Sequence, residues 1–213
     1  MVSEQFLSSL LTSQCESRKI SEMLEKMAVE IAEEKEVPAY CNDILVFLLK
    51  NWKELASNPH ATRICQVIFK EPMYWRQRDY IMDNEIMGHI VQFSQEKYAS
   101  HIIEIAIKYS SPLYLEKIFN EILFAYVPVR DPEANRGASS LSALEVIMFD
   151  QFGNYVFQHL YRAAKDVYNS KRPGQKGWLL VLDNTIQCNL DKLRRLTHGR
   201  HILNNNFKNS GIN

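Results

Sequence analysis

The stretch Asp150-Gln151-Phe152-Gly153-Asn154-Tyr155-Val156-Phe157-Gln158-His159-Leu160 has the spacing of an amphipathic helix. With about 100° of rotation per residue, Asn154, Tyr155 and Gln158 lie on one face, and Val156 and Phe157 lie on the other. Two amides can hydrogen-bond the edge of a flat heterocycle while the neighbouring ring stacks on it. The stretch therefore predicts a helix that binds a flat, hydrogen-bonding ligand.

The same order of residue types recurs at four other places in the chain. The positions equivalent to Asn154 are Ser17, Thr62, Ser100 and Arg200. Successive positions lie roughly 38 to 54 residues apart, and this period is typical of a solenoid of two-helix units that bury their apolar faces against one another. The copy around Arg200 is looser than the central three, and the copy around Ser17 is the poorest.

Composition is that of an ordinary globular domain: of 213 residues, 46% are hydrophobic and 23% charged. The net charge is zero, which counts mildly against nucleic-acid binding, although charges can segregate onto opposite faces. The longest apolar run, residues 44–49, is too short to span a membrane. Four scattered cysteines without a C-x-x-C pair favour reduced thiols. We therefore expect a cytoplasmic protein without a membrane segment.

Helical patterns alternate with short breaks along the chain, as a solenoid requires. They cover residues 4–36, 41–56, 80–95, 112–124, 141–149 and 178–196. Residues 127–140 contain two prolines and a glycine in a polar segment and are predicted to form a loop. We interpret this loop as an insertion into a repeat, because without it the long step from Ser100 to Asn154 matches the others. A second, basic loop is predicted at residues 169–177.

Three of these stretches resemble the repeats of the Pumilio (PUF) family of RNA-binding proteins. Residues 152–158 are similar to the family's uracil-reading helix, and residues 98–104 to its guanine-reading helix. Residues 198–203, preceded by Leu196 and Thr197, resemble its C-terminal cap. The resemblance covers roughly residues 12–205 and implies an all-α fold, a right-handed α-solenoid of Pumilio-type helical repeats.

The implied domain organisation has three parts. Residues 1–40 match poorly and are expected to be a degenerate N-terminal repeat or cap, residues 41–208 the Pumilio-type repeats and C-terminal cap, and residues 209–213 a tail. Family members usually carry eight repeats plus caps, and this chain has the length for about half of them.

Each triplet offers two side chains at i and i+4 that can read a base edge, and one at i+1 that can stack. The predicted RNA-binding residues are Asn154, Tyr155, Gln158, Ser100, His101, Glu104, Thr62, Arg63 and Gln66. Amides both donate and accept, so the pair Asn154 and Gln158 suits uracil, which presents one N–H between two carbonyls. The Glu104 carboxylate only accepts and therefore suits the adjacent donors of guanine.

The remaining triplets are weaker readers. In the family, a small residue with glutamine and a stacking arginine goes with adenine, so Thr62, Arg63 and Gln66 are expected to read adenine or uracil. The copy with Ser17 and Ser21 has no amide or carboxylate at i+4 and is expected to read no base specifically. Family RNA runs antiparallel to the protein, which implies a core of 5′-UG followed by A or U.

The resemblance implies sequence-selective binding of single-stranded mRNA and post-transcriptional regulation through 3′ untranslated regions. The expected protein is a monomer that recruits repressor or deadenylase proteins and needs no cofactor. An alternative is a protein-interaction scaffold whose RNA-binding face has decayed, and a weaker one is a nucleolar ribosome-assembly relative. We expect no enzyme and no metal site, because the sequence has no H-E-x-x-H, Gly-rich phosphate loop or G-x-S-x-G.

Overall fold

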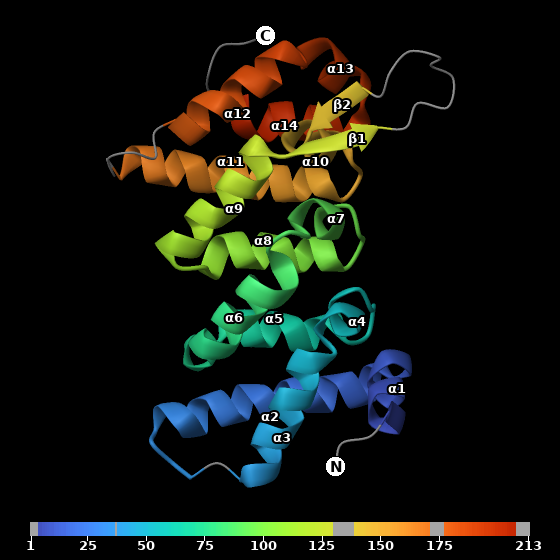
Figure 1. Cartoon of the computed structure of the whole chain (residues 1–213), viewed down its shortest axis with the longest axis vertical. Helices are drawn as coiled ribbons and strands as arrows, with labels where there is room; N and C mark the ends of the chain where they lie inside the picture. Colours follow the sequence, from blue (N-terminus) through green and yellow to red (C-terminus); the bar gives the residue numbers. More distant parts are fainter. Residues whose placement is uncertain (1–3, 37, 130–138, 171–176, 208–213) are drawn as a thin grey trace. The chain divides into compact units, whose positions relative to one another are not determined.

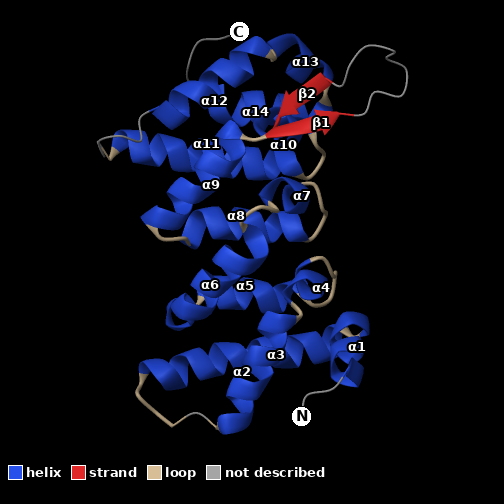
Figure 2. Cartoon of the chain, viewed as in Figure 1, coloured by secondary structure: helices blue, strands red, loops and turns tan. Residues whose placement is uncertain are grey.

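The computed structural model describes residues 4–36, 38–129, 139–170 and 177–207. These residues form helices, turns and one two-stranded ribbon (Figure 2). They divide into two compact units, the first made of residues 1–89 and 97–109 and the second of residues 90–96 and 110–213. The prediction of an all-α fold is confirmed, with the ribbon as a small addition.

The first unit stacks helices α2, α5 and α8 side by side in chain order (Figure 1). Its elements are α1 (Glu4–Thr12), α2 (Gln14–Ala32), α3 (Ala39–Lys50), α4 (Trp52–Ala56), α5 (Thr62–Lys70), η1 (Pro72–Tyr74), α6 (Trp75–Ile81), η2 (Met82–Ile86) and α8 (Ala99–Tyr109). Trp52 and Phe69 are fully buried and meet with ring centroids 5.8 Å apart. The buried Tyr74 hydroxyl donates to the Leu24 carbonyl at 2.7 Å, which ties η1 to α2.

The second unit is centred on helix α11, which packs against α10, α12 and α14. Its elements are α7 (Ile90–Ser94), α9 (Pro112–Phe124), β1 (Tyr126–Val129), β2 (Ser139–Ser142), α10 (Ala143–Phe149), α11 (Gly153–Asn169), α12 (Gly177–Cys188), α13 (Leu190–Arg195) and α14 (Thr197–Phe207). Phe119 of α9 and Trp178 of α12 stack with centroids 4.1 Å apart and planes inclined by 8°. This aromatic pair joins α9 to α12.

Four of the predicted helical segments are divided in the structure, most of them where a side-chain hydrogen bond competes with the helix. Residues 178–196 divide at Asn189, whose side chain returns to the Thr185 carbonyl at 2.9 Å. Residues 4–36 form two helices, because the Ser13 side chain accepts from the backbone N–H of Glu16 and caps α2. Residues 41–56 divide at Asn51, whose side chain returns to the Phe47 carbonyl at 2.8 Å. The continuous helix predicted for residues 80–95 is wrong: a π-helical turn is followed by Gly88, whose φ of 83° is left-handed and favours glycine.

The predicted insertion at residues 127–140 is not a plain loop. Its ends pair as an antiparallel ribbon, with Tyr126 opposite Ser142 and Val129 opposite Ser139. Residues 130–138 lie outside the described residues, as do the tail 209–213 and most of the predicted basic loop. By contrast, the helix predicted for residues 112–124 is confirmed at both ends, because Pro112 suits a first helical turn and the Ser111 side chain caps it by accepting from the Tyr114 N–H.

Within the described parts of the chain, no helix combines the length and the apolar character that crossing a bilayer requires.

Candidate nucleic-acid interface

The three predicted reading triplets all lie in the first turns of long helices. Thr62 opens α5, Ser100 is the second residue of α8, and Asn154 is the second residue of α11. The first two belong to the first unit and the third to the second unit. The structure therefore brings the α5 and α8 triplets together on packed helices.

Each triplet has the same pattern of burial. The stacking residues Arg63, His101 and Tyr155 are exposed, and Tyr155 is 51% exposed. The two residues that follow each of them are buried; they are Ile64 and Cys65, Ile102 and Ile103, and Val156 and Phe157. This alternation anchors each helix by its apolar side and leaves one stacking side chain accessible to a ligand.

The reading amides of α11 are buried and bound to the protein. Asn154 is 1% exposed and Gln158 is 3% exposed. The Gln158 amide donates to Asn154 Oδ1 at 3.2 Å, and the Asn154 amide donates to the Gln151 carbonyl at 2.8 Å. A base could bind their edges only by exchanging these hydrogen bonds, so the net gain per contact would be modest.

The α8 triplet is arranged in the same way. The Ser100 hydroxyl is buried and donates to the Lys97 carbonyl at 3.3 Å. The exposed His101 ring lies with Nδ1 3.2 Å from Glu104 Oε1, and the Glu104 side chain is 16% exposed. A carboxylate has two acceptor oxygens and can accept more than one hydrogen bond.

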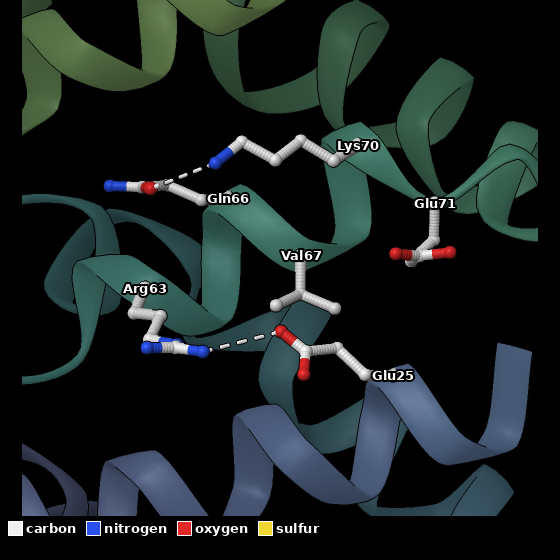
Figure 3. Close-up of a pocket in the computed structure, with 6 residues that line it drawn as sticks. All are labelled: Glu25, Arg63, Gln66, Val67, Lys70 and Glu71. Atoms are coloured by element: carbon white, nitrogen blue, oxygen red, sulfur yellow. Dashed lines mark hydrogen bonds and ion pairs between the residues drawn. The ribbon is translucent and has the colours of Figure 1, made fainter.

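The α5 triplet has one hydroxyl whose hydrogen bonding is incomplete. The buried Thr62 Oγ1 finds no hydrogen-bond partner among the residues that the structure describes. Arg63 Nη2 lies 3.4 Å from Glu25 Oε1 of α2, and the Lys70 ammonium donates to Gln66 Oε1 at 3.4 Å (Figure 3). The Gln66 oxygen faces Lys70, and the Gln66 NH₂ group points away from Lys70, as Figure 3 shows.

Residues outside the triplets hold the reading helices in place, and the triplet pattern did not reveal them. Asp150 Oδ1 accepts from the backbone N–H groups of Phe152 and Gly153, both at 2.8 Å. Asn58 Oδ1 accepts from His60 and Ala61 at 2.8 and 3.1 Å in the corresponding turn before α5. The signal was available: an Asp or Asn stands four residues before the first reading residue in both copies.

Small residues also set the approach of the reading helices. A Cβ atom on Gly153 would lie 2.6 Å from the Ile147 carbonyl oxygen of α10, closer than a real Cβ contact allows. Ala61 and Ala99 occupy the equivalent positions before Thr62 and Ser100, and both are buried. Gly153 therefore lets α11 approach α10 closely, and α5 packs against α4 in the first unit.

No group of histidine, cysteine and acidic side chains suited to a metal ion occurs within the described ranges. The three triplets offer hydrogen-bonding groups, flat side chains and charge.

Comparison with known proteins identifies the repeats. The model of the Pumilio-family RNA-binding repeat matches residues 89–123 and 146–168, which include the α8 and α11 triplets. Pumilio domain-containing protein 5 of Caenorhabditis elegans is 28% identical over 173 residues, covering 75% of this chain and 30% of that protein. The chain contains Pumilio (PUF) family RNA-binding repeats. The α5 triplet lies outside the matched repeats.

Two further C. elegans proteins are similar to this chain. Fem-3 mRNA-binding factor 2 of C. elegans is 29% identical over 161 residues, covering 71% of this chain and 24% of that protein. Pumilio domain-containing protein 6 of C. elegans is 27% identical over 219 residues, covering 93% of this chain and 43% of that protein. The chain spans less than half the length of each of these curated relatives.

Solved Pumilio-family structures share the helical solenoid fold of this chain. The crystal structure of PUF-6 in complex with 5BE13 RNA superposes with a TM-score of 0.77 and 24% identity, covering 93% of this chain and 54% of that one. The Puf3 RNA-binding domain bound to a Cox17 3′ UTR recognition sequence gives a TM-score of 0.64 and 20% identity, covering 94% and 52%. The family is one of RNA-binding repeats and not of enzymes, in agreement with the sequence-based expectation.

Proposed function

We propose that this chain binds single-stranded mRNA selectively, with a core of 5′-UG followed by A or U. The observation that carries the proposal is the shared burial pattern of the three helices, in which one exposed flat side chain stands beside two polar residues and is followed by two buried ones. The match to Pumilio-family RNA-binding repeats supports it.

The assignment of bases follows from the donors and acceptors of each triplet. Uracil would bind at α11, where Asn154 and Gln158 exchange their mutual hydrogen bond for the base edge and Tyr155 stacks. Guanine would bind at α8, because the Glu104 carboxylate accepts from two adjacent N–H donors while His101 stacks. Both exchanges replace an existing contact, so selectivity comes from the difference between the hydrogen bonds that the matching base offers and those that it displaces.

The third base would bind at α5. Gln66, held by Lys70, offers its NH₂ group, and adenine N1 or a uracil carbonyl can accept from it. The unsatisfied Thr62 hydroxyl is a further group that a bound base or a water could satisfy. The Arg63 guanidinium would stack on the base.

Binding should be modest. Stacking of three bases contributes roughly 1–3 kcal/mol each, and this must exceed the cost of ordering the RNA and the side chains. The chain is also electrically neutral, so non-specific attraction to phosphate is weak.

The cellular role that we propose is post-transcriptional regulation in the cytoplasm through 3′ untranslated regions, with a monomer that recruits repressor or deadenylase proteins. The names of the relatives support this: one C. elegans relative is named an mRNA-binding factor, and the Puf3 structure holds a 3′ UTR sequence. A protein-interaction scaffold with a decayed RNA-binding face is the competing function.

The test is titration of the purified chain with a labelled RNA that contains 5′-UGA and with a scrambled RNA of equal length and composition, at one salt concentration. We expect tighter binding of the 5′-UGA strand than of the scrambled strand, and weaker binding of the 5′-UGA strand by Tyr155→Ala, with Tyr168→Ala, another exposed tyrosine of α11, as the matched control. Equal affinity for both strands would support the scaffold instead.

A further inference from the structure

Two short stretches of the chain share a charge pattern that arginine-directed protein kinases recognise. Residues 194–197 (Arg-Arg-Leu-Thr) and residues 18–21 (Arg-Lys-Ile-Ser) each place basic side chains three and two positions before a hydroxyl. Kinases choose their substrates partly by such patterns of charge. We name the two stretches the C-terminal motif and the N-terminal motif. The sequence alone does not distinguish them.

The structure distinguishes the motifs by the accessibility of the hydroxyl. In the N-terminal motif, Ser21 lies in the middle of α2, is fully buried, and donates to the Ser17 carbonyl at 2.9 Å. In the C-terminal motif, Thr197 is exposed at the junction of α13 and α14. A kinase that modifies the native chain can therefore reach Thr197 but not Ser21.

The backbone around Thr197 is also suited to a kinase, which binds its substrate segment in an extended conformation. Leu196 is already extended, with φ of −94° and ψ of 138°, because it ends α13. Helix α13 has six residues, and Leu193 is the buried residue among them. Only the exposed last turn of this short helix has to open, and such local opening costs little.

Basic side chains close to Thr197 can hold a phosphate once it is attached. Arg200 is three residues further along α14, so it lies beside Thr197 on the helix surface. Its Nε donates to the Arg194 carbonyl at 3.2 Å, and a guanidinium has further N–H donors for a phosphate. The acidic residue of α13, Asp191, is 89% exposed and lies 3.8 Å from Arg194, so this pair competes weakly for the arginine.

The position of Thr197 at the start of α14 favours a phosphate as well. The first N–H groups of a helix have no intrahelical partner, and the helix dipole places positive charge at that end. A phosphate on Thr197 would add about −1.5 to −2 charges there at pH 7. The modification should therefore be compatible with the folded helix.

Thr197 also lies near the turn that opens α11. The ring of the next residue, His198, has Nε2 2.9 Å from the Phe149 carbonyl oxygen. Phe149 is the last residue of α10, just before that turn, and α14 packs against α11 within the second unit. A phosphate on Thr197 would therefore add negative charge close to the α11 triplet.

We propose that Thr197 is phosphorylated by an arginine-directed serine/threonine kinase and that the phosphate weakens RNA binding at the α11 triplet. In the transfer, the Thr197 hydroxyl oxygen forms a bond to the γ-phosphorus of ATP, the bond from that phosphorus to ADP breaks, and the hydroxyl proton passes to the catalytic aspartate of the kinase. The effect on RNA rests on the proposed function and arises because the phosphate repels the phosphates of a bound strand.

The first experiment incubates the native chain with ATP and the catalytic subunit of the cyclic-AMP-dependent protein kinase, and mass spectrometry maps the modified residues. We expect phosphate on Thr197 and not on Ser21. Synthetic peptides of residues 190–201 and 14–25 should both be modified, because both carry the charge pattern without the fold. A native chain that takes up no phosphate at Thr197, or takes it up as readily at Ser21, would overturn the proposal.

Two variants test whether the charge pattern directs the kinase. Arg195→Ala removes the basic residue two positions before Thr197 and should slow phosphorylation on the order of tenfold or more. Lys192→Ala removes the same charge from α13 at a position outside the motif and should leave the rate unchanged. Equal rates in the two variants would show that the motif is not recognised.

The second experiment titrates the phosphorylated and the untreated chain with the 5′-UGA strand at low and at high salt. We expect several-fold weaker binding after phosphorylation at low salt and a smaller difference at high salt. Kinase-treated Thr197→Ala should bind as the untreated wild type does. Equal affinity of the two forms at low salt would overturn the regulatory effect. If neither form binds RNA, the proposed function fails, while the mapped phosphate on Thr197 stands.

Discussion

Asp150 is predicted to stabilise the second unit by holding the turn that starts α11. Its Oδ1 atom accepts two backbone N–H groups, from Phe152 and Gly153, both at 2.8 Å. These N–H groups stand at the beginning of a helix, where intrahelical partners are missing. Removing such a capping acceptor costs about 0.5–2 kcal/mol, and bonds to a carboxylate lie at the strong end. We therefore expect Asp150→Ala to lower the free energy of unfolding by about 1–2 kcal/mol.

The measurement is urea-induced unfolding followed by far-ultraviolet circular dichroism, with Asp150→Asn as the matched control. Asparagine keeps the Oδ1 acceptor, and Asn58 shows that it can make the same two contacts in the turn before α5. Asp150→Asn should therefore cost less than half as much as Asp150→Ala. Equal losses in the two variants would show that the acceptor atom does not hold the turn, and the reasoning would be wrong.

The turn also connects stability to base reading. The Asn154 side chain donates to the carbonyls of Asp150 and Gln151, at 3.3 and 2.8 Å. A loosened turn should therefore misplace the reading amide, and Asp150→Ala should weaken binding of the 5′-UG strand more than binding of a scrambled strand.

Three further predictions concern packing and pH, and urea unfolding measures each of them. Gly153→Ala should lower the free energy of unfolding by about 1–3 kcal/mol through the clash with α10, whereas Gly177→Ala, with open space around it, should not; similar effects would contradict the close approach. Tyr74→Phe should lower the free energy of unfolding by about 1 kcal/mol, because the hydrogen bond to α2 is lost. Burial also raises the pKa of Tyr74, so the wild type should lose stability above about pH 10. The same alkaline loss in Tyr74→Phe would refute this origin. The hydrogen bond from Ser142 lowers the pKa of Glu145. The contribution of Glu145 to stability is therefore present above about pH 4.5 and is lost as the pH falls through its lower pKa in the folded state. Glu145→Gln should reduce the loss of stability at acid pH, and an unchanged pH profile would exclude that origin.

The helices could be predicted from the sequence because their apolar spacing and proline signals are local. The helix from Pro112 to Phe124 was predicted at both ends for this reason. The breaks at Ser13 and Asn51 were missed because one side-chain hydrogen bond competes with the helix there, and hydrophobic periodicity does not register it. The ribbon was missed because a polar segment with two prolines resembles a loop, and the pairing joins the two ends of that segment instead of neighbouring residues.

The positions of the reading triplets could be predicted from the sequence, but the burial and hydrogen bonding of their side chains could not. Periodicity placed Asn154 and Gln158 on one helix face, yet it did not reveal that both are buried and bonded to each other. The pocket between the start of α2 and the turn before α5 was also missed, because its lining residues are far apart in the sequence. Such sites depend on tertiary packing, which a single helix pattern does not encode.

The central claim is that each triplet reads one base, and Glu104 tests it most directly because a carboxylate can only accept. Replacing Ser100 by Asn and Glu104 by Gln copies the α11 triplet onto α8. The wild-type chain and the double variant are each titrated with a 5′-UG and a 5′-UU strand at one salt concentration. We expect the preference to change from 5′-UG to 5′-UU by about 1–3 kcal/mol, the scale of a good bidentate base contact. An unchanged ratio of affinities would contradict the assignment of guanine to α8 and, with it, the order of bases along the chain.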